Sequence, residues 1–241
     1  MHKRNWPVAI LIALLFFIHS CKPSDNGSMQ PFDGYPLIEN RDEIRQILKD
    51  KCLDTIHFRK GEVIADIGAG NGYLEGMLSV YTDSLTFYIQ DIDTTVCNQK
   101  AVNEAVDFYQ NVRGRPVTNE FFAVNGTDST TNLPDSTFDK ILMLWTYPYI
   151  KKPGKFMTDI RVKLKDGGLF YVINPAMDYD DDHTLILAYG WNASPLEKQI
   201  SDIIGWGFEL IRISRNYEDP ELPYIMVFKK KNLPAATQEV K

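Results

Sequence analysis

Three glycines at alternate positions, set between an apolar run and an amphipathic segment, constrain the fold of this chain more than any other feature. The stretch reads Val63-Ile-Ala-Asp66-Ile-Gly68-Ala69-Gly70-Asn-Gly72-Tyr-Leu. The apolar run predicts a buried parallel strand, the glycines a tight turn, and the residues after them a helix. Because glycine has no Cβ, a ligand can press against bare backbone there. The acid at the end of the strand favours a ligand with amino or hydroxyl groups over one with phosphate.

Strands alternate with helices along most of the chain. The apolar pattern predicts strands at 63–67, 85–90, 117–124, 138–144 and 169–173, and helices at 39–58, 73–80, 93–112, 155–164 and 195–204. Asp93 is the expected cap of the third helix, and 166–168 the expected turn before the fifth strand. Two last strands, 208–214 and 224–230, have no helix between them and predict an antiparallel hairpin. We therefore expect an α/β fold: a doubly wound, mainly parallel seven-stranded sheet with helices on both faces.

Polar residues that can bind a ligand follow the first four predicted strands. An open parallel sheet binds ligands beyond the carboxyl ends of its strands, where the strand order reverses. Asp66, Asp91, Asp128 and the segment 144–147 should meet at that edge. Asp91 follows the glycines at about the 20-residue spacing at which a carboxylate binds ribose hydroxyls. The pattern predicts a nucleoside ligand, and NAD is one of the ligands that it leaves open.

Four stretches together resemble the class I S-adenosylmethionine-dependent methyltransferases, over about residues 41–230. They are Lys60–Tyr73, which looks like the first motif of the family, Ile89–Asp93, Leu133–Leu142 and Leu164–Phe170. The resemblance implies a Rossmann-like methyltransferase fold with S-adenosylmethionine as the cofactor. The acid before the glycines and the closing hairpin favour this reading over an NAD-dependent oxidoreductase.

The resemblance also implies which residues bind the cofactor. They are Asp66, Gly68, Ala69, Gly70, Gly72, Asp91, Ile92, Asp128, Ser129, Leu144 and Trp145. Asp66 and the glycine backbone would face the methionine part, and Asp91 and Ile92 the ribose and adenine. Asp128 would accept from the adenine amino group, with the Ser129 amide nearby. The last two residues would border the transferred methyl group.

Tyr147 and His183 are the candidate catalytic residues. Methyl transfer depends mainly on alignment, and a base is needed only where the acceptor must lose a proton. Some similar bacterial methyltransferases have Asn-Thr-Tyr-His where this chain has Trp-Thr-Tyr-Pro-Tyr at 145–149, without the histidine. A packed aromatic below the pocket rim is the alternative role of Tyr147. The acidic loop 178–183 can close over an acceptor or hold a divalent metal, but a solvated loop is the simpler interpretation, and we expect no metal site.

The first residues of the chain have the form of a signal peptide. A basic start is followed by the apolar run Val8–Ile18, which is too short to span a membrane. Ser20-Cys21 then resembles the lipobox of bacterial lipoproteins, which implies lipidation of Cys21; an ordinary signal peptide and a short anchor are the alternatives. We expect four parts: a signal peptide (1–20), a lipidated cysteine with a flexible tether (21–38), a methyltransferase-like domain (39–231) and a disordered tail (232–241).

This leader predicts a membrane-anchored lipoprotein of the cell envelope, on the periplasmic or surface side. An anchor that keeps the domain on the cytoplasmic side is the minority interpretation. An exported domain is separated from a cofactor that is made in the cytoplasm, so the leader and the domain point to different compartments. Cys52 and Cys97 are expected to be free thiols, each in a predicted helix.

The composition limits the partners. A formal net charge of −6 argues against nucleic-acid binding, because the phosphate backbone would be repelled. The leading hypothesis is therefore an S-adenosylmethionine-dependent methyltransferase that acts on a small-molecule acceptor. The alternative is a non-catalytic, membrane-tethered ligand-binding module on the same fold. The sequence does not indicate an oligomeric state.

Overall fold

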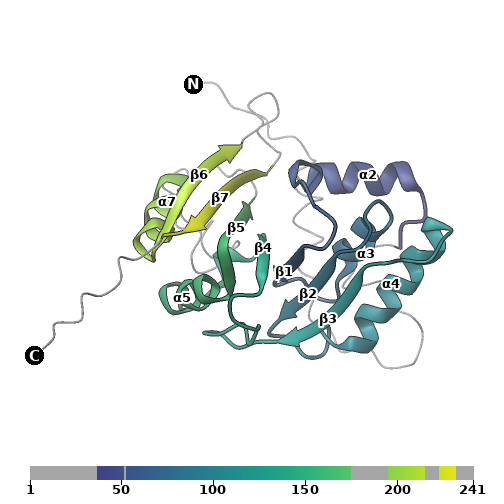
Figure 1. The fold of residues 1–241 in the computed structure, drawn as a ribbon, viewed down its shortest axis with the longest axis horizontal. Coiled ribbons are helices and arrows are strands. Elements are labelled where there is room, and N and C mark those ends of the chain that lie inside the picture. The colour runs from purple at the N-terminus through teal and green to yellow at the C-terminus, as the bar shows by residue number, and fades with distance from the viewer. Residues whose placement is uncertain (1–36, 52, 175–194, 215–222, 232–241) are drawn as a thin grey trace, which may run out of the picture. The chain divides into compact units, whose positions relative to one another are not determined.

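A computed structural model describes residues 37–51, 53–174, 195–214 and 223–231 of the 241-residue chain. One seven-stranded sheet has the order β3-β2-β1-β4-β5-β7-β6 (Figure 1). Its strands are β1 (Val63–Ile67), β2 (Thr86–Asp91), β3 (Glu120–Asn125), β4 (Phe138–Leu144), β5 (Leu164–Asn174), β6 (Phe208–Ser214) and β7 (Tyr224–Lys230). The first five strands are parallel, and β7 runs antiparallel to both β5 and β6. The expected α/β fold with its closing hairpin is confirmed.

The helices cover the sheet in two groups. They are α2 (Arg41–Asp50), α3 (Tyr73–Ser79), α4 (Gln99–Arg113), α5 (Pro153–Lys163) and α7 (Leu196–Gly205), with short 3₁₀ turns η2 (Leu53–Thr55) and η3 (Tyr147–Tyr149). Figure 1 shows α3 and α4 beside the β1–β3 half of the sheet, and α5 and α7 beside the β4–β7 half. No helix among the described residues is long and apolar enough to cross a membrane.

Strand β1 is buried on both faces, as expected for a central parallel strand. Ala65 and Ile67 belong to the core cluster that also holds residues of α5 and α7. Alternate residues point the other way. Asp66 therefore lies on the opposite face, where α3 packs against α4 through the edge-to-face rings of Tyr73 and Tyr109.

Two helix boundaries differ from the prediction by more than two residues. Helix α2 ends at Asp50 instead of residue 58. The expected cap at Asp93 is wrong: α4 begins at Gln99, and the Asn98 side chain accepts a hydrogen bond of 3.0 Å from Ala101 N. The Asp93 carboxylate instead accepts from the amide and hydroxyl of Thr95, at 2.8 and 2.6 Å, and so forms a local turn.

The expected turn at 166–168 is part of strand β5. A Cβ on Gly168 would lie 2.8 Å from the carbonyl oxygen of Phe138, so the glycine allows β4 and β5 to approach closely there. Gly167 has a φ of 78°, and the register against β4 shifts between Phe138 and Lys140. The two glycines thus form an irregularity within the strand and do not end it.

Cys97 is a free, buried thiol, as expected. It lies just before α4 and not within a helix, and its Sγ donates a hydrogen bond of 3.3 Å to the Ile89 carbonyl. Several predictions fall on residues outside those that the structure describes. They concern the signal peptide (1–20), Cys21 and most of its tether, Cys52, the loop 178–183 with His183, and the tail from 232.

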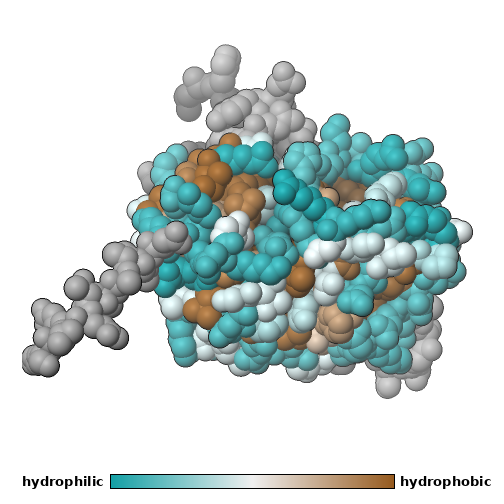
Figure 2. All heavy atoms as spheres, viewed as in Figure 1, coloured by the Kyte–Doolittle hydropathy of each residue, from teal (hydrophilic) through white to brown (hydrophobic). Residues whose placement is uncertain are grey.

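Strand β6 forms one edge of the sheet and carries two exposed apolar side chains. Ile211 and Ile213 are 47% and 41% exposed. Figure 2 shows hydrophobic residues near the position of β6 and β7, within a face that is otherwise mostly polar. This edge is separate from the carboxyl ends of the parallel strands, where the polar residues of interest lie.

Candidate functional site

The strand order reverses at β1, which pairs with β2 on one side and β4 on the other. After β1 the chain forms β2 and β3 on one side of it and then crosses to β4 on the other side. The loops that follow β1 and β4 therefore lead to opposite sides of the sheet. A parallel sheet opens at such a switch point, beyond the carboxyl ends of the strands. The residues that follow β1, β2 and β4 are therefore the candidate site.

The glycine loop after β1 needs its glycines. Gly68, Gly70 and Gly72 have φ values of 75°, 57° and 77°, in the left-handed region that residues with a Cβ rarely adopt. A Cβ on Gly68 would also lie 2.3 Å from Oγ1 of Thr146, which follows β4. The loop can take this path against β4 only because Gly68 has no side chain.

Backbone hydrogen bonds fix the loop to the end of β2. The amides of Gly68 and Ala69 both donate to the Gln90 carbonyl, at 2.7 and 3.0 Å. The amide of Gly70 donates to Oδ2 of Asp91 at 3.0 Å. The predicted loop residues and the predicted ribose-binding carboxylate are thus direct neighbours.

Both carboxylate oxygens of Asp91 accept hydrogen bonds from backbone amides. Its Oδ1 accepts from the amide of Asp93 at 2.9 Å, which complements the bond between Oδ2 and Gly70. A carboxylate offers about four lone-pair positions, so each oxygen can still accept one hydroxyl. Ile92, the next residue, is 61% exposed and presents an apolar surface beside this carboxylate.

Asp66 is almost completely buried, at 2% exposure. In the sheet it lies between Ile89 and Leu142, both of them fully buried and apolar. Burial raises the pKa of the Asp66 carboxyl, and the charge of Asp91 acts in the same direction. Glu75 in the first turn of α3 is fully buried too, and burial followed by the charge of Asp66 raises its pKa well above the ordinary value.

Asp128 and Ser129 lie in the loop after β3. The Asp128 carboxylate accepts a hydrogen bond of 2.9 Å from Nζ of Lys152, and this bond lowers the pKa of Asp128. The side chains of Lys152 and Asp128 are 59% and 44% exposed. The Ser129 amide donates to Oγ1 of Thr127 at 3.2 Å. The two residues lie on the loop where adenine contacts are expected, with Asp128 paired to a lysine at the start of α5.

Leu144 is the last residue of β4, and Trp145 follows in a left-handed conformation with a φ of 56°. The Trp145 amide donates to the Ile173 carbonyl at 2.7 Å, which anchors the turn to β5. The ammonium of Lys51, just after α2, lies over the indole ring. The turn after β4 therefore presents an aromatic ring at the carboxyl edge of the sheet.

Tyr147 is in the core rather than in an open pocket. It is 1% exposed and belongs to the same cluster as Phe156 of α5 and Ile203 of α7. Burial raises the pKa of the Tyr147 phenol, and Asp202 and Tyr224 add to the shift. A phenol that stays protonated cannot act as a base near neutral pH. His183, the other catalytic candidate, lies outside the described residues.

Buried polar atoms without a hydrogen-bond partner gather at this edge of the sheet. Among the described residues they include Asp66 Oδ1, Gln90 Nε2, Trp145 Nε1 and Asn174 Oδ1. All four residues lie at or next to the carboxyl end of a parallel strand. Unpaired buried polar atoms are costly, so such a group is typical of a site that a polar ligand completes.

Sequence reasoning did not single out four residues of this region: Lys51, Glu75, Gln90 and Asn174. Gln90 and Asn174 are polar residues that end apolar strands, which is a signal the sequence does contain. Glu75 stands alone as an acid in an otherwise mostly apolar helix. No group of three or more potential ligands that could hold a metal ion occurs in the described part of the chain.

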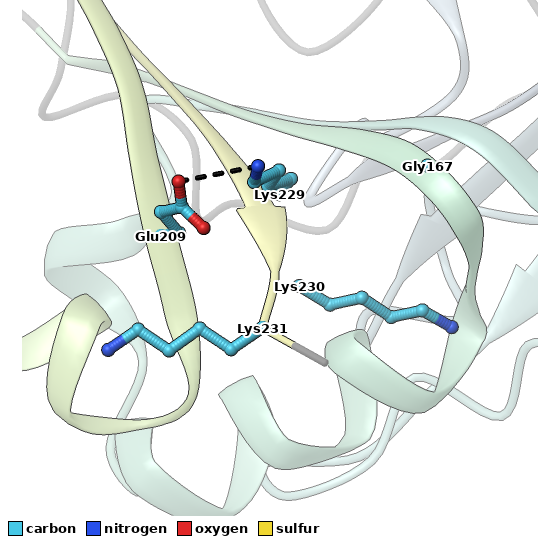
Figure 3. A pocket seen from close by; sticks show the side chains of 5 residues that line it. All are labelled: Gly167, Glu209, Lys229, Lys230 and Lys231. Atoms are coloured by element: carbon cyan, nitrogen blue, oxygen red, sulfur yellow. Dashed lines mark ion pairs between the residues drawn. The ribbon is translucent and has the colours of Figure 1, made fainter. Parts of the chain in front are cut away.

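A cavity of about 550 Å³ lies outside the candidate site. Gly167, Glu209 and Lys229–Lys231 line it, and Lys229 forms an ion pair of 3.3 Å with Glu209 (Figure 3). It is at the amino-terminal part of β5 and the end of β7, away from the glycine loop. We therefore assign the candidate site from the strand ends and not from this cavity.

Residues 65–172 match a protein-family model described as "Methyltransferase domain". The matched segment runs from β1 to β5 and contains the glycine loop, Asp91 and the turn after β4. Comparison with curated protein sequences gives no match.

Solved structures of methyltransferases have the same fold. A SAM-dependent methyltransferase from Aquifex aeolicus is 16% identical, with a TM-score of 0.55, and the alignment covers 78% of this chain and 97% of that one. A TehB-like SAM-dependent methyltransferase from Corynebacterium glutamicum is 16% identical, with a TM-score of 0.53 and coverages of 80% and 97%. An arsenic(III) S-adenosylmethionine methyltransferase from Chlamydomonas reinhardtii is 14% identical, with a TM-score of 0.54 and coverages of 83% and 75%. The chain thus has the Rossmann-like fold of the S-adenosylmethionine-dependent methyltransferases.

Proposed function

We propose that this chain binds S-adenosylmethionine at the carboxyl ends of β1, β2 and β4 and transfers its methyl group to a small-molecule acceptor. The observation that carries the proposal is the contact between the bare backbone of the glycine loop and Asp91 at the switch point of the sheet. The match of residues 65–172 to a methyltransferase domain supports it. The charge of −6 favours a small acceptor over a nucleic acid.

The residues present fit this cofactor. Asp91 has acceptor capacity left for the two ribose hydroxyls, and the exposed Ile92 can lie against the adenine. The buried Asp66, with one unpaired oxygen, suits the ammonium of the methionine part. Asp128 and Ser129 would bind the adenine edge, and Asp128 must then share its carboxylate with Lys152.

The chemistry needs little from the protein beyond alignment. When bound, the cofactor supplies a methyl group on a positively charged sulfur, which is an electrophile. Leu144 and the Trp145 ring would border that end and exclude water from it, while the glycine loop fixes its position. The Tyr147 phenol can donate a hydrogen bond but not accept a proton near neutral pH, because burial raises its pKa.

The second candidate function is a ligand-binding module that does not methylate. The buried position of Tyr147 favours it, since this residue follows β4, where a catalytic group was expected. Such a module would still bind the adenosyl compound. The two functions therefore differ in turnover and not in binding.

The lipid anchor belongs to the proposal as well. Cys21 after the apolar run Val8–Ile18 would carry the lipid and hold the domain at the cell envelope. Metabolic labelling with radioactive palmitate should label the protein, and Cys21→Ala should abolish the label. Equal labelling of both proteins would refute lipidation at this residue.

Calorimetric titration tests the proposed ligand. The full chain should bind S-adenosylmethionine and S-adenosylhomocysteine but not NAD⁺. Asp91→Ala should weaken both by about tenfold or more, because a hydrogen bond to a charged group is worth roughly 1.5–3 kcal/mol. Asp107→Ala, an exposed acid of α4, is the matched control and should leave the affinity unchanged. Heat with NAD⁺ and none with the adenosyl compounds would favour an oxidoreductase.

A further inference from the structure

Two carboxyl groups lie together beneath the glycine loop. Asp66 is the next-to-last residue of the buried strand β1, and Glu75 comes from the first turn of α3, the helix that follows the loop. Their exposures are 2% and 0%. Each carboxyl acts on the titration of the other, so the two side chains are in close electrostatic contact.

The pair has fewer partners than two ionised carboxylates need. Oδ1 of Asp66 and both carboxyl oxygens of Glu75 are buried and accept no hydrogen bond from any other described residue, so the hydrogen bond open to them is the one between the two carboxyls. Burial and the repulsion between two like charges both oppose ionisation of the second carboxyl. The two carboxyls therefore retain one proton between them. Ile89 and Leu142, on either side of Asp66 in the sheet, provide no polar group.

Within the part of the chain that the structure describes, no cation acts on the titration of either carboxyl of the pair. From β2 comes the Asp91 carboxylate, which opposes ionisation of Asp66. Burial raises the pKa of the Cys97 thiol, just before α4, and Asp91 and Glu75 are also close enough to raise it. Helix α4 contributes the phenol of Tyr109, whose ring packs against Tyr73. The ammonium of Lys51, just after α2, lies over the Trp145 ring.

We propose that Glu75 is a positioning residue of the cofactor site, which shares one proton with Asp66 in the empty pocket and releases it when the ligand's ammonium binds beside Asp66. This inference rests on the proposed function. The ammonium cancels the field of Asp66 at Glu75. Burial, that field and the hydrogen bond to Asp66 are the three effects that raise the pKa of Glu75. The affinity for a ligand with an amino group then rises with pH, by up to about tenfold per pH unit for one proton released.

Two ligands separate this effect from adenosine binding. S-adenosylhomocysteine carries the ammonium, whereas 5′-methylthioadenosine has the same adenosine and thioether without it. Calorimetry in buffers of different ionisation enthalpy counts the protons released by the full chain. We expect release with the first ligand, none with the second, and an association constant for the first that increases with pH.

Glu75→Gln keeps the shape of a protonated glutamate and removes the titration. It should bind S-adenosylhomocysteine without releasing a proton and with an affinity that does not change with pH. Glu104→Gln, on the exposed side of α4, is the control and should behave as the wild type. Equal proton release from the wild type and Glu75→Gln would overturn the inference, because the ligand's own amino group titrates identically in both.

The empty protein gives a test that does not depend on the proposed function. A buried acid with a raised pKa contributes stability that is complete below its unfolded value and is lost as pH rises through the folded value. The unfolding free energy of the wild type should therefore fall more steeply with rising pH than that of Glu75→Gln. Parallel curves would contradict the shared proton. If neither ligand binds, the proposed function and the proton release both fail, while these curves still decide whether the pair holds a proton.

Discussion

The ammonium of Lys51 lies 3.2 Å from the centroid of the Trp145 ring. Lys51 comes just after α2, whereas Trp145 follows β4, nearly a hundred residues later. The contact fixes the end of α2 beside the carboxyl edge of the sheet. A cation on an aromatic face is stabilised by the ring quadrupole, so the two residues hold each other in place.

This contact predicts a pH-dependent fluorescence change. Burial lowers the pKa of Lys51 to about 8, against the smaller opposing effect of Asp50. The lysine should be charged below that pH and neutral above it, so the emission of Trp145 should change with a midpoint near pH 8. Lys51→Met should lose the transition, and Lys49→Met, at an exposed position in the last turn of α2, should keep it. An unaltered transition in Lys51→Met would show that another group is responsible.

Gly68→Ala should destabilise the protein more than Gly61→Ala. Both glycines have a positive φ, of 75° and 84°, which costs an L-residue about 1–2 kcal/mol. Only at Gly68 does the new Cβ also meet Thr146, which adds roughly 1–3 kcal/mol, since Gly61 has nothing within 4 Å. Urea unfolding of the two variants measures the difference. Equal losses of unfolding free energy would mean that the loop moves away from β4 without cost.

Cys97 should be almost unreactive in the folded protein. Burial raises the pKa of its thiol to about 11, and the charge of Asp91 adds to the shift. At pH 8 only about 0.1% is then thiolate, the reactive form. In a Cys21→Ser, Cys52→Ser variant, modification by a disulfide reagent should be about 100-fold slower in buffer than in guanidinium. Rapid modification of the folded variant would contradict the buried position.

The features that could be predicted from the sequence are local. The apolar runs predicted the bounds of β1 and β4 correctly, and the glycines located the loop because residues with a Cβ rarely adopt its backbone conformation. The start of α4 was missed because Asp93 and Asn98 are both good caps. Their hydrogen bonds, and not their residue types, decide between them.

The parts of the site that the sequence did not reveal depend on tertiary contacts. Glu75 looks like a surface acid of a helix, but α3 is buried on nearly all sides, so the carboxyl faces inward. The left-handed backbone at Trp145 has no sequence signal, since tryptophan seldom adopts it. Its contact with Lys51 joins segments that no local pattern connects.

A crystal structure of the chain with S-adenosylhomocysteine tests the central claim most directly. The account predicts both ribose hydroxyls within hydrogen-bonding distance of Asp91, the amino-acid part over Gly68 and Gly70, and the ammonium beside Asp66. An adenosyl group bound elsewhere, or a glycine loop covered by the protein's own side chains, would contradict it.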